Sequence, residues 1–132
     1  MIDETALASV FAAIGEDGFQ RVVAGFYRRV PNDDLLGPMY PPQDLAAAEQ
    51  RLRDFLVYRF GGPDRYLPQR GHPRLRMRHA PFAIPTGARD RWVSLMDQSI
   101  AEANLPPATV EIMREFLHST ATMLINTTND GG

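Results

Sequence analysis

Histidine has the widest choice of chemistry among the residues of this sequence, and it occurs three times. His79 lies in an arginine-rich stretch directly before the apolar residues 80–82, whereas His72 precedes a proline and His118 lies within an apolar helical pattern. A neutral imidazole is the commonest protein ligand of metal ions and also transfers protons near neutral pH. We expect a surface or capping role for His118, and His72 is ambiguous. His79 is therefore the candidate on which the chemistry depends.

The surroundings of His79 contain the ingredients that a haem group needs. A five-coordinate haem requires one neutral imidazole on a short, positioned helix, an apolar slot for the porphyrin, and cations for its propionates. Arginines 74, 76 and 78 offer planar donors that suit carboxylates, although alone they would also fit a small basic patch. Apolar side chains for the slot, each of which could equally be plain core, are Leu52, Phe55, Leu56, Met77, Phe82 and Met96. Taken alone, His79 is explained as well by a core or surface role.

Three aromatic side chains carry a polar group that needs a partner if it is buried. Tyr27 lies on an otherwise aliphatic helical stripe, so its hydroxyl would be buried and require a hydrogen bond. Trp92 offers a single donor, its indole N–H. There are two interpretations of Tyr27, Tyr40 and Trp92. They are either core residues whose polar groups find hydrogen-bond partners within the protein, or donors aimed at a ligand opposite His79.

Composition excludes several classes of function. The chain has no cysteine, so disulfides, thiolate zinc sites and thiol catalysis are ruled out. It carries no phosphate-binding loop, zinc-protease motif or nucleophile elbow. A net charge of −2 argues against a nucleic-acid partner. No apolar run reaches the roughly 18 residues of a membrane span, and the first ten residues do not resemble a signal peptide. We expect a cytoplasmic protein with no membrane partner.

The length of 132 residues fits one domain, and the apolar pattern is helical. Apolar residues recur at helical spacing over about residues 7–14, 17–30, 45–56, 86–100 and 110–124. Asp3 or Thr5 would cap the first helix and Asp44 the third. No period-two strand of useful length is found. The prediction is an all-α fold over residues 1–132.

Two proline-rich segments separate these helices. Residues 31–42 contain four prolines and should be extended or turned, with room for one short helical turn. Residues 63–85 contain five prolines and should be irregular except for a short helix over 74–80, which would carry His79. Irregular segments this long in a compact domain are usually functional. The polar tail from Asn126 is expected to fray.

Five stretches resemble the group II truncated haemoglobins, in that family's order and spacing from about residue 7 to 125. They are Phe26-Tyr27, Pro38 to Pro42, Ala47 to Arg53, Gly61 to Phe82, and Arg89 to Trp92. The run from Gly71 to His79, Gly-His-Pro-Arg-Leu-Arg-Met-Arg-His, is the most specific of them. The resemblance implies a shortened globin, a two-over-two α-helical sandwich with a mostly extended loop on the proximal side of the haem.

The resemblance also implies the cofactor and its ligands. The cofactor would be haem b, iron protoporphyrin IX, with His79 as the proximal iron ligand. Tyr27, Tyr40 and Trp92 match the distal polar residues of the family. Ala48 occupies the distal position where many globins carry histidine, and Leu52 faces the same pocket one turn further along. The positions that match further haem contacts, including the propionates, are Arg51, Leu56, Tyr66, Met77, Arg78 and Phe82.

Two departures from the family pattern stand out. The family usually has a double glycine after its first helix, whereas here Gly15 and Gly18 are separated by two acidic residues. The family often has Tyr-Trp before Gly61, whereas this chain has Tyr58-Arg59-Phe60. The first departure should alter a local turn and the second the packing beneath the haem edge. Neither should affect the iron.

The expected function is therefore binding of O2, CO, NO or other small ligands at the haem iron. Distal donors should slow O2 release, which makes simple oxygen transport a weak hypothesis. One alternative is a haem enzyme that detoxifies nitric oxide, peroxide or peroxynitrite, as a nitric oxide dioxygenase or peroxidase-like activity. A second is a haem-free helical interaction module. A reductase partner is compatible with the sequence, and the physiological ligand and oligomeric state are left open by it.

Overall fold

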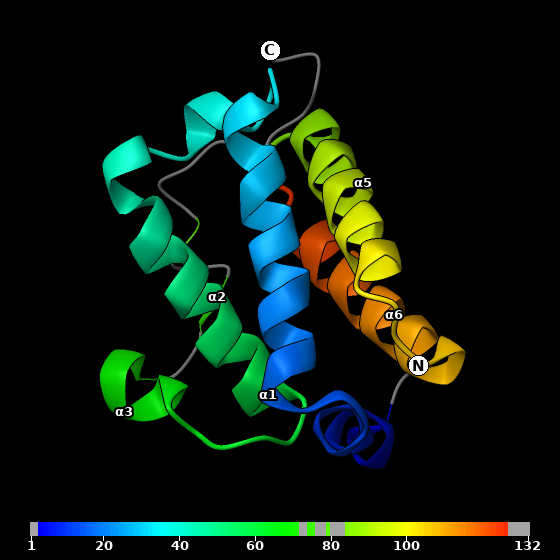
Figure 1. The fold of residues 1–132 in the computed structure, drawn as a ribbon. Coiled ribbons are helices and arrows are strands. Elements are labelled where there is room, and N and C mark those ends of the chain that lie inside the picture. Colours follow the sequence, from blue (N-terminus) through cyan, green and yellow to red (C-terminus); the bar gives the residue numbers. More distant parts are fainter. Residues whose placement is uncertain (1–2, 72–73, 76–78, 80–83, 127–132) are drawn as a thin grey trace.

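The computed structural model describes residues 3–71, 74–75, 79 and 84–126, and the regular elements in this part of the chain are helices (Figure 1). In chain order they are α1 (Glu4–Arg29), the 3-10 turns η1 (Val30–Asn32), η2 (Gly37–Met39) and η3 (Pro42–Asp44), α2 (Leu45–Arg59), α3 (Tyr66–Arg70), α5 (Thr86–Glu102) and α6 (Pro107–Met123). None of the described helices has a stretch both long and apolar enough to cross a membrane.

Four long helices form two layers of two. α1 packs against α2 in one layer, and α5 packs against α6 in the other. α1 also contacts both α5 and α6, so it joins the layers (Figure 1). The apolar faces predicted from helical spacing meet between the layers, where the largest completely buried side chains include Phe19, Phe26, Phe60, Met96, Ile100 and Met113.

The first helix is bent sharply at Gly15. That residue has φ 64° and ψ −175°, a conformation that glycine adopts without steric cost. The bend turns residues 4–14 across the long second half of α1, as the dark blue end of the ribbon shows (Figure 1). The predicted boundary between the first two helical stretches is therefore confirmed as a bend. The Asp3 carboxylate accepts the Ala6 N–H at 2.7 Å, which is the predicted N-terminal cap.

The first half of α1 is seated on the turn that follows α2. The Phe11 N–H donates to the Phe60 carbonyl at 3.1 Å. Gly61 has φ 94°, and a Cβ there would lie 2.6 Å from the Ala8 carbonyl oxygen. Only glycine combines that dihedral angle with so close an approach of two backbones.

The segment between α1 and α2 differs from its prediction. It contains three 3-10 turns, not one helical turn. Asp44 is the N-cap residue of α2, as predicted, but its side chain makes no cap hydrogen bond. The Leu45 N–H already donates to the Pro42 carbonyl within η3. The Asp44 carboxylate accepts instead from Arg51 at 2.7 Å.

The second proline-rich segment contains a helix that the sequence did not predict. α3 begins at Tyr66, where the Asp64 carboxylate accepts the Leu67 N–H at 2.9 Å, and it ends at Gly71 with φ 74°. Further along, Leu75 and His79 have helical conformation. Asn126, the first residue of the tail expected to fray, is hydrogen-bonded to Ile84 through its backbone N–H, and residues 127–132 lie outside the described residues.

Candidate functional site

The three aromatic residues with polar groups lie together around one buried phenylalanine. Tyr27 lies near the end of α1, Tyr40 follows η2, and Trp92 lies in α5. Phe26 is completely buried, and its ring centroid is 5.2 Å from that of Tyr27, 6.4 Å from Tyr40 and 5.3 Å from Trp92. Tyr27 and Tyr40 meet edge-to-face at 5.9 Å. Three separate elements thus bring these residues into one group, which we call the distal cluster.

The polar groups of the distal cluster are held in defined protonation states. Burial raises the pKa of Tyr40 to about 12, against a hydrogen bond from Trp92 that lowers it. Burial also raises the pKa of Tyr27 far above its usual range, and the neighbouring Tyr40 adds to this, while the Arg51 guanidinium acts in the opposite direction. Both hydroxyls are therefore protonated, and available as donors, throughout the physiological pH range.

An ion-pair group next to Trp92 fixes the segment that carries Tyr40. The Asp33 carboxylate accepts the backbone N–H groups of Leu35 and Leu36 at 3.0 and 2.7 Å, and Arg91 donates to it at 2.6 Å. Burial acts to raise the pKa of Asp33, but the hydrogen bonds from Leu36 and Arg91 outweigh it and hold the pKa below its usual range. Sequence reasoning missed this group. An aspartate two residues after a proline at a helix end was the available signal.

The other sequence-predicted contacts lie along α2 and at the start of α3. Ala48 and Leu52 are half-buried and one turn apart on α2, and Leu56 is completely buried in the core. Arg51 pairs with Asp44, and Tyr66 is buried against Phe55 with ring centroids 5.4 Å apart. The predicted contacts Met77, Arg78 and Phe82, with His72, lie outside the described residues.

His79 is half-buried, and its ring has a defined orientation. Its Nδ1 lies 2.7 Å from the backbone carbonyl oxygen of Leu75. A carbonyl oxygen only accepts hydrogen bonds, so Nδ1 carries the proton and donates it. In the neutral ring the lone pair is therefore on Nε2. An imidazole fixed in this way, with Nδ1–H on a carbonyl and Nε2 free to coordinate, is the arrangement of metal-binding histidines.

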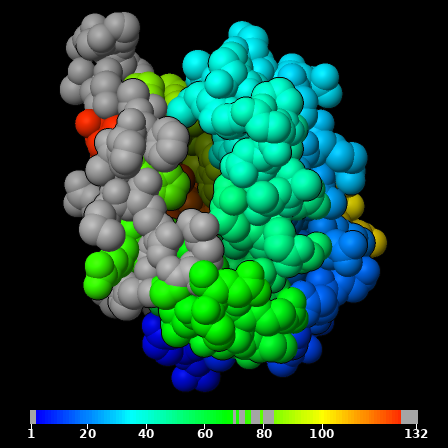
Figure 2. Space-filling view, turned by 90° about the vertical axis from the view of Figure 1, so that its left-hand side faces the viewer, coloured from blue at the N-terminus to red at the C-terminus, as the bar shows by residue number. Residues whose placement is uncertain are grey.

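The surface beside α2 is hollowed. In the space-filling view a recess opens next to α2, and the colours of α5 and α6 are visible at its floor (Figure 2). The donor set, an imidazole that donates through Nδ1 and a group of protonated hydroxyls, has the chemistry that would hold a haem and a polar ligand. The residues present thus fit haem.

The unusual glycine spacing at the bend of α1 is used by an ion-pair network. Glu16, directly after the bend, accepts from Arg65, which also lies 3.6 Å from the buried Asp54 of α2. The hydrogen bond from Arg65 lowers the pKa of Glu16. The network connects α1, α2 and the residue before Tyr66. The inserted acidic pair therefore supplies a link that the sequence pattern did not reveal, and an altered local turn stays a prediction.

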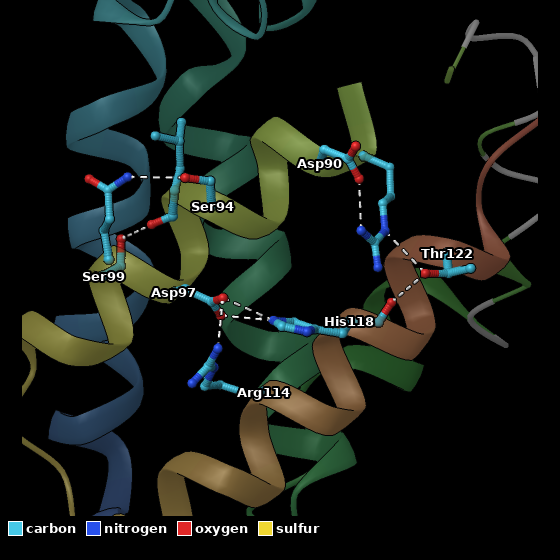
Figure 3. Close-up of polar contacts among 10 residues, drawn as sticks. Asp90, Ser94, Asp97, Ser99, Arg114, His118 and Thr122 are labelled. Carbon is cyan, nitrogen blue, oxygen red and sulfur yellow. Dashed lines mark hydrogen bonds and ion pairs between the residues drawn. The ribbon is translucent and has the colours of Figure 1, made fainter. Parts of the chain in front are cut away.

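His118 connects the two helices of the second layer. Its Nε2 lies 2.9 and 3.1 Å from the two carboxylate oxygens of Asp97 in α5, and Arg114 contacts the same carboxylate at 3.3 Å (Figure 3). Of the surface or capping role expected from the sequence, the capping alternative is not observed: the ring is partly exposed and bonds to a side chain of the neighbouring helix.

Comparisons with known proteins agree with this geometry. A model of the bacterial-like globin family matches residues 9–126. The group 2 truncated hemoglobin YjbI of Bacillus subtilis is 36% identical over 118 residues, covering 89% of each chain. Among solved structures, the thermostable hemoglobin of Thermobifida fusca is 42% identical with a TM-score of 0.85, covering 89% of this chain and 96% of that one. The group II truncated hemoglobin of Bacillus anthracis is 35% identical with a TM-score of 0.86, covering 91% and 92%. The chain belongs to the bacterial-like globin family and is a group II truncated haemoglobin, with the two-over-two fold, that binds haem and small diatomic ligands.

Proposed function

We propose that His79 would hold the haem iron through Nε2 and that the distal cluster would supply hydrogen-bond donors to O2 at the haem. The convergence of Tyr27, Tyr40 and Trp92 from three elements onto Phe26 is the observation that carries this proposal. Tyr27, Tyr40 and Trp92 are partly buried against the core, where apolar side chains would pack without the desolvation cost of two hydroxyls and an indole N–H. The arrangement is better explained as a set of donors kept for a polar ligand.

The haem supplies an open coordination position for a diatomic ligand. Tyr27 and Trp92 each offer a donor to that ligand, and Tyr40 lies edge-to-face against Tyr27 beside them. Donors in a pocket of low dielectric favour a ligand that carries partial negative charge. O2 gains more negative charge than CO on binding, so the cluster should retain O2 selectively.

Strong retention of O2 implies storage, sensing or chemistry more than transport. A relative from Bacillus subtilis whose solved structure is described as a truncated oxygen-avid haemoglobin is 35% identical, with a TM-score of 0.83. This chain has the same fold and contains the distal cluster described above. Oxygen avidity in this protein is thus supported by the donors themselves and by that relative.

Two measurements test the proposal. Purified protein loaded with haem should give a five-coordinate ferrous spectrum, and its oxygenated form should release O2 slowly compared with its release of CO. Fast O2 release from the wild type would contradict the role given to the distal cluster. The detoxifying enzyme is separated by mixing the oxygenated form with nitric oxide and a reductant. Repeated consumption and recovery on a catalytic timescale would assign turnover to the same site.

A further inference from the structure

Asn126, the residue three positions after α6, is hydrogen-bonded to both ends of the span from His79 to Ile84. Its backbone N–H donates to the Ile84 carbonyl at 3.0 Å, and its side-chain Oδ1 accepts the Ile84 N–H at 2.8 Å. Its Nδ2 donates to the His79 carbonyl at 3.4 Å. One exposed side chain thus joins the end of the last helix to the backbone of the candidate iron ligand.

The end of α6 is itself held against α5. Arg89, in the first turn of α5, donates through Nε to the Thr122 hydroxyl at 3.1 Å, and that hydroxyl donates to the His118 carbonyl at 2.9 Å (Figure 3). One turn earlier, His118 is bonded to Asp97. Asn126 therefore follows a helix end whose position is fixed by the second layer. The hydrogen bond from Asn126 therefore holds the backbone of His79 in place relative to α5 and α6.

We propose that Asn126 is a positioning residue for His79. This inference rests on the proposed function, in which His79 Nε2 coordinates the iron. The Leu75 carbonyl sets the rotation of the imidazole ring, and Asn126 sets the position of the backbone from which the ring extends. Two independent hydrogen bonds then define where Nε2 lies, one on the ring and one on the main chain.

The amide side chain suits this task by its chemistry. It presents an acceptor and a donor at once, and here the acceptor binds Ile84 while the donor binds His79. Aspartate at this position would keep the acceptor and lose the donor. Asn126→Asp therefore removes the donor to residue 79 and retains the acceptor for Ile84. Asn32 is exposed in η1, so Asn32→Asp is a matched control for the added charge.

The first experiment compares these two variants in the haem-loaded protein. Asn126→Asp should shift the iron–histidine stretching band in the ferrous resonance Raman spectrum. It should also speed haem transfer to an acceptor apoglobin by roughly 2- to 10-fold, the range for loss of one neutral hydrogen bond. Asn32→Asp should change neither. An unshifted band with an unchanged transfer rate in Asn126→Asp would overturn the inference.

A second background separates positioning from a general loss of stability. In His79→Gly supplied with imidazole, the iron ligand is no longer attached to the backbone, so Asn126→Asp should no longer affect haem transfer. An equal acceleration in both backgrounds would mean that Asn126 only stabilises the fold, which overturns the inference. If His79→Gly keeps a normal five-coordinate spectrum without imidazole, the ligand assignment itself fails, and that outcome is distinct from a failure at Asn126 alone.

Discussion

The distal cluster and the segment around His79 are held in opposite ways. Tyr27, Tyr40 and Trp92 are fixed by ring packing around the completely buried Phe26 and come from three elements of the core. His79 is fixed by two hydrogen bonds: its ring Nδ1–H donates to the Leu75 carbonyl, and its own backbone carbonyl accepts from Asn126 Nδ2. Ring packing shields the partly buried donors from part of the solvent. Hydrogen bonds to main-chain carbonyls fix direction at a half-exposed site, which suits a ligand that must point at one atom.

Removal of the His79 imidazole should have the largest effect, because that ring is the proposed iron ligand itself. We expect His79→Ala to lose haem, with an effect larger than the roughly 10- to 100-fold that loss of a partner behind a metal ligand costs. Haem content and the ferrous spectrum measure this. His118→Ala is the control and should retain haem, because His118 is engaged with Asp97. A five-coordinate spectrum in His79→Ala without added imidazole would disprove the assignment.

The distal side is tested by removing single donors. Loss of a hydrogen bond to a partly charged oxygen costs about 1.5–3 kcal/mol, so Tyr27→Phe or Trp92→Phe should speed O2 dissociation by roughly 10- to 150-fold. CO dissociation should change far less. The double variant should be non-additive, because Tyr40 connects the two donors.

Stopped-flow dissociation of both gases measures these effects. Tyr58→Phe is the matched control, since Tyr58 stacks on Tyr66 outside the distal cluster. Equal acceleration of O2 and CO in the distal variants would indicate a steric gate and not hydrogen bonding.

Alkaline pH should weaken the distal side specifically. Burial raises the pKa of Tyr40 from its model-compound value of 10.0 to about 12, so the unfolded chain ionises first. The stabilisation is complete below pH 10 and is lost as the pH rises toward 12. Urea unfolding at several pH values should show the free energy of unfolding falling across this window. The slope should be smaller in Tyr40→Phe, and an unchanged slope would count against the burial of that hydroxyl.

The smallest effect on haem and O2 binding is expected from Arg51, which belongs neither to the distal cluster nor to the segment around His79. It pairs with Asp44 at 2.7 Å, and both side chains are more than a third exposed. Such pairs are worth about 0–1 kcal/mol, so Arg51→Ala should speed haem loss by less than roughly fivefold and leave O2 dissociation nearly unchanged. Arg53→Ala, two residues along α2, is the control. A large change in O2 dissociation with unchanged haem loss would place Arg51 on the distal side instead.

The helices were predictable where the signal is local. Gly15 and the Gly61-Gly62-Pro63 turn mark real boundaries, because a positive φ and a missing N–H act within a few residues. The helix α3 was not predictable, since five residues are too few to show helical spacing. Its position depends on the burial of Tyr66 against Phe55, a contact between elements that no local pattern encodes.

In the candidate site, too, local signals were readable and contacts between distant residues were not. Tyr27, Trp92 and His79 were ambiguous as single residues, and only the family resemblance singled them out together. The ion-pair group that holds the segment carrying Tyr40 was missed because its partners are far apart in sequence. Arg91 and Asp33 are separated by 58 positions, and in a chain with many arginines and aspartates no spacing rule selects that pair. Which distant charged residues pair is decided only when the folded backbone brings them together.

The backbone contact at Gly61 sets how tolerant different parts of the molecule are to sequence change. In the core between the layers, a substitution at one side chain can be absorbed when its neighbours repack. At Gly61 the nearest atoms to an added methyl group belong to the main chain of Ala8, and no side chain stands between them to adjust. At the contact between the first half of α1 and the end of α2, Gly61 should therefore be retained during evolution, whereas the apolar residues around it should tolerate substitution.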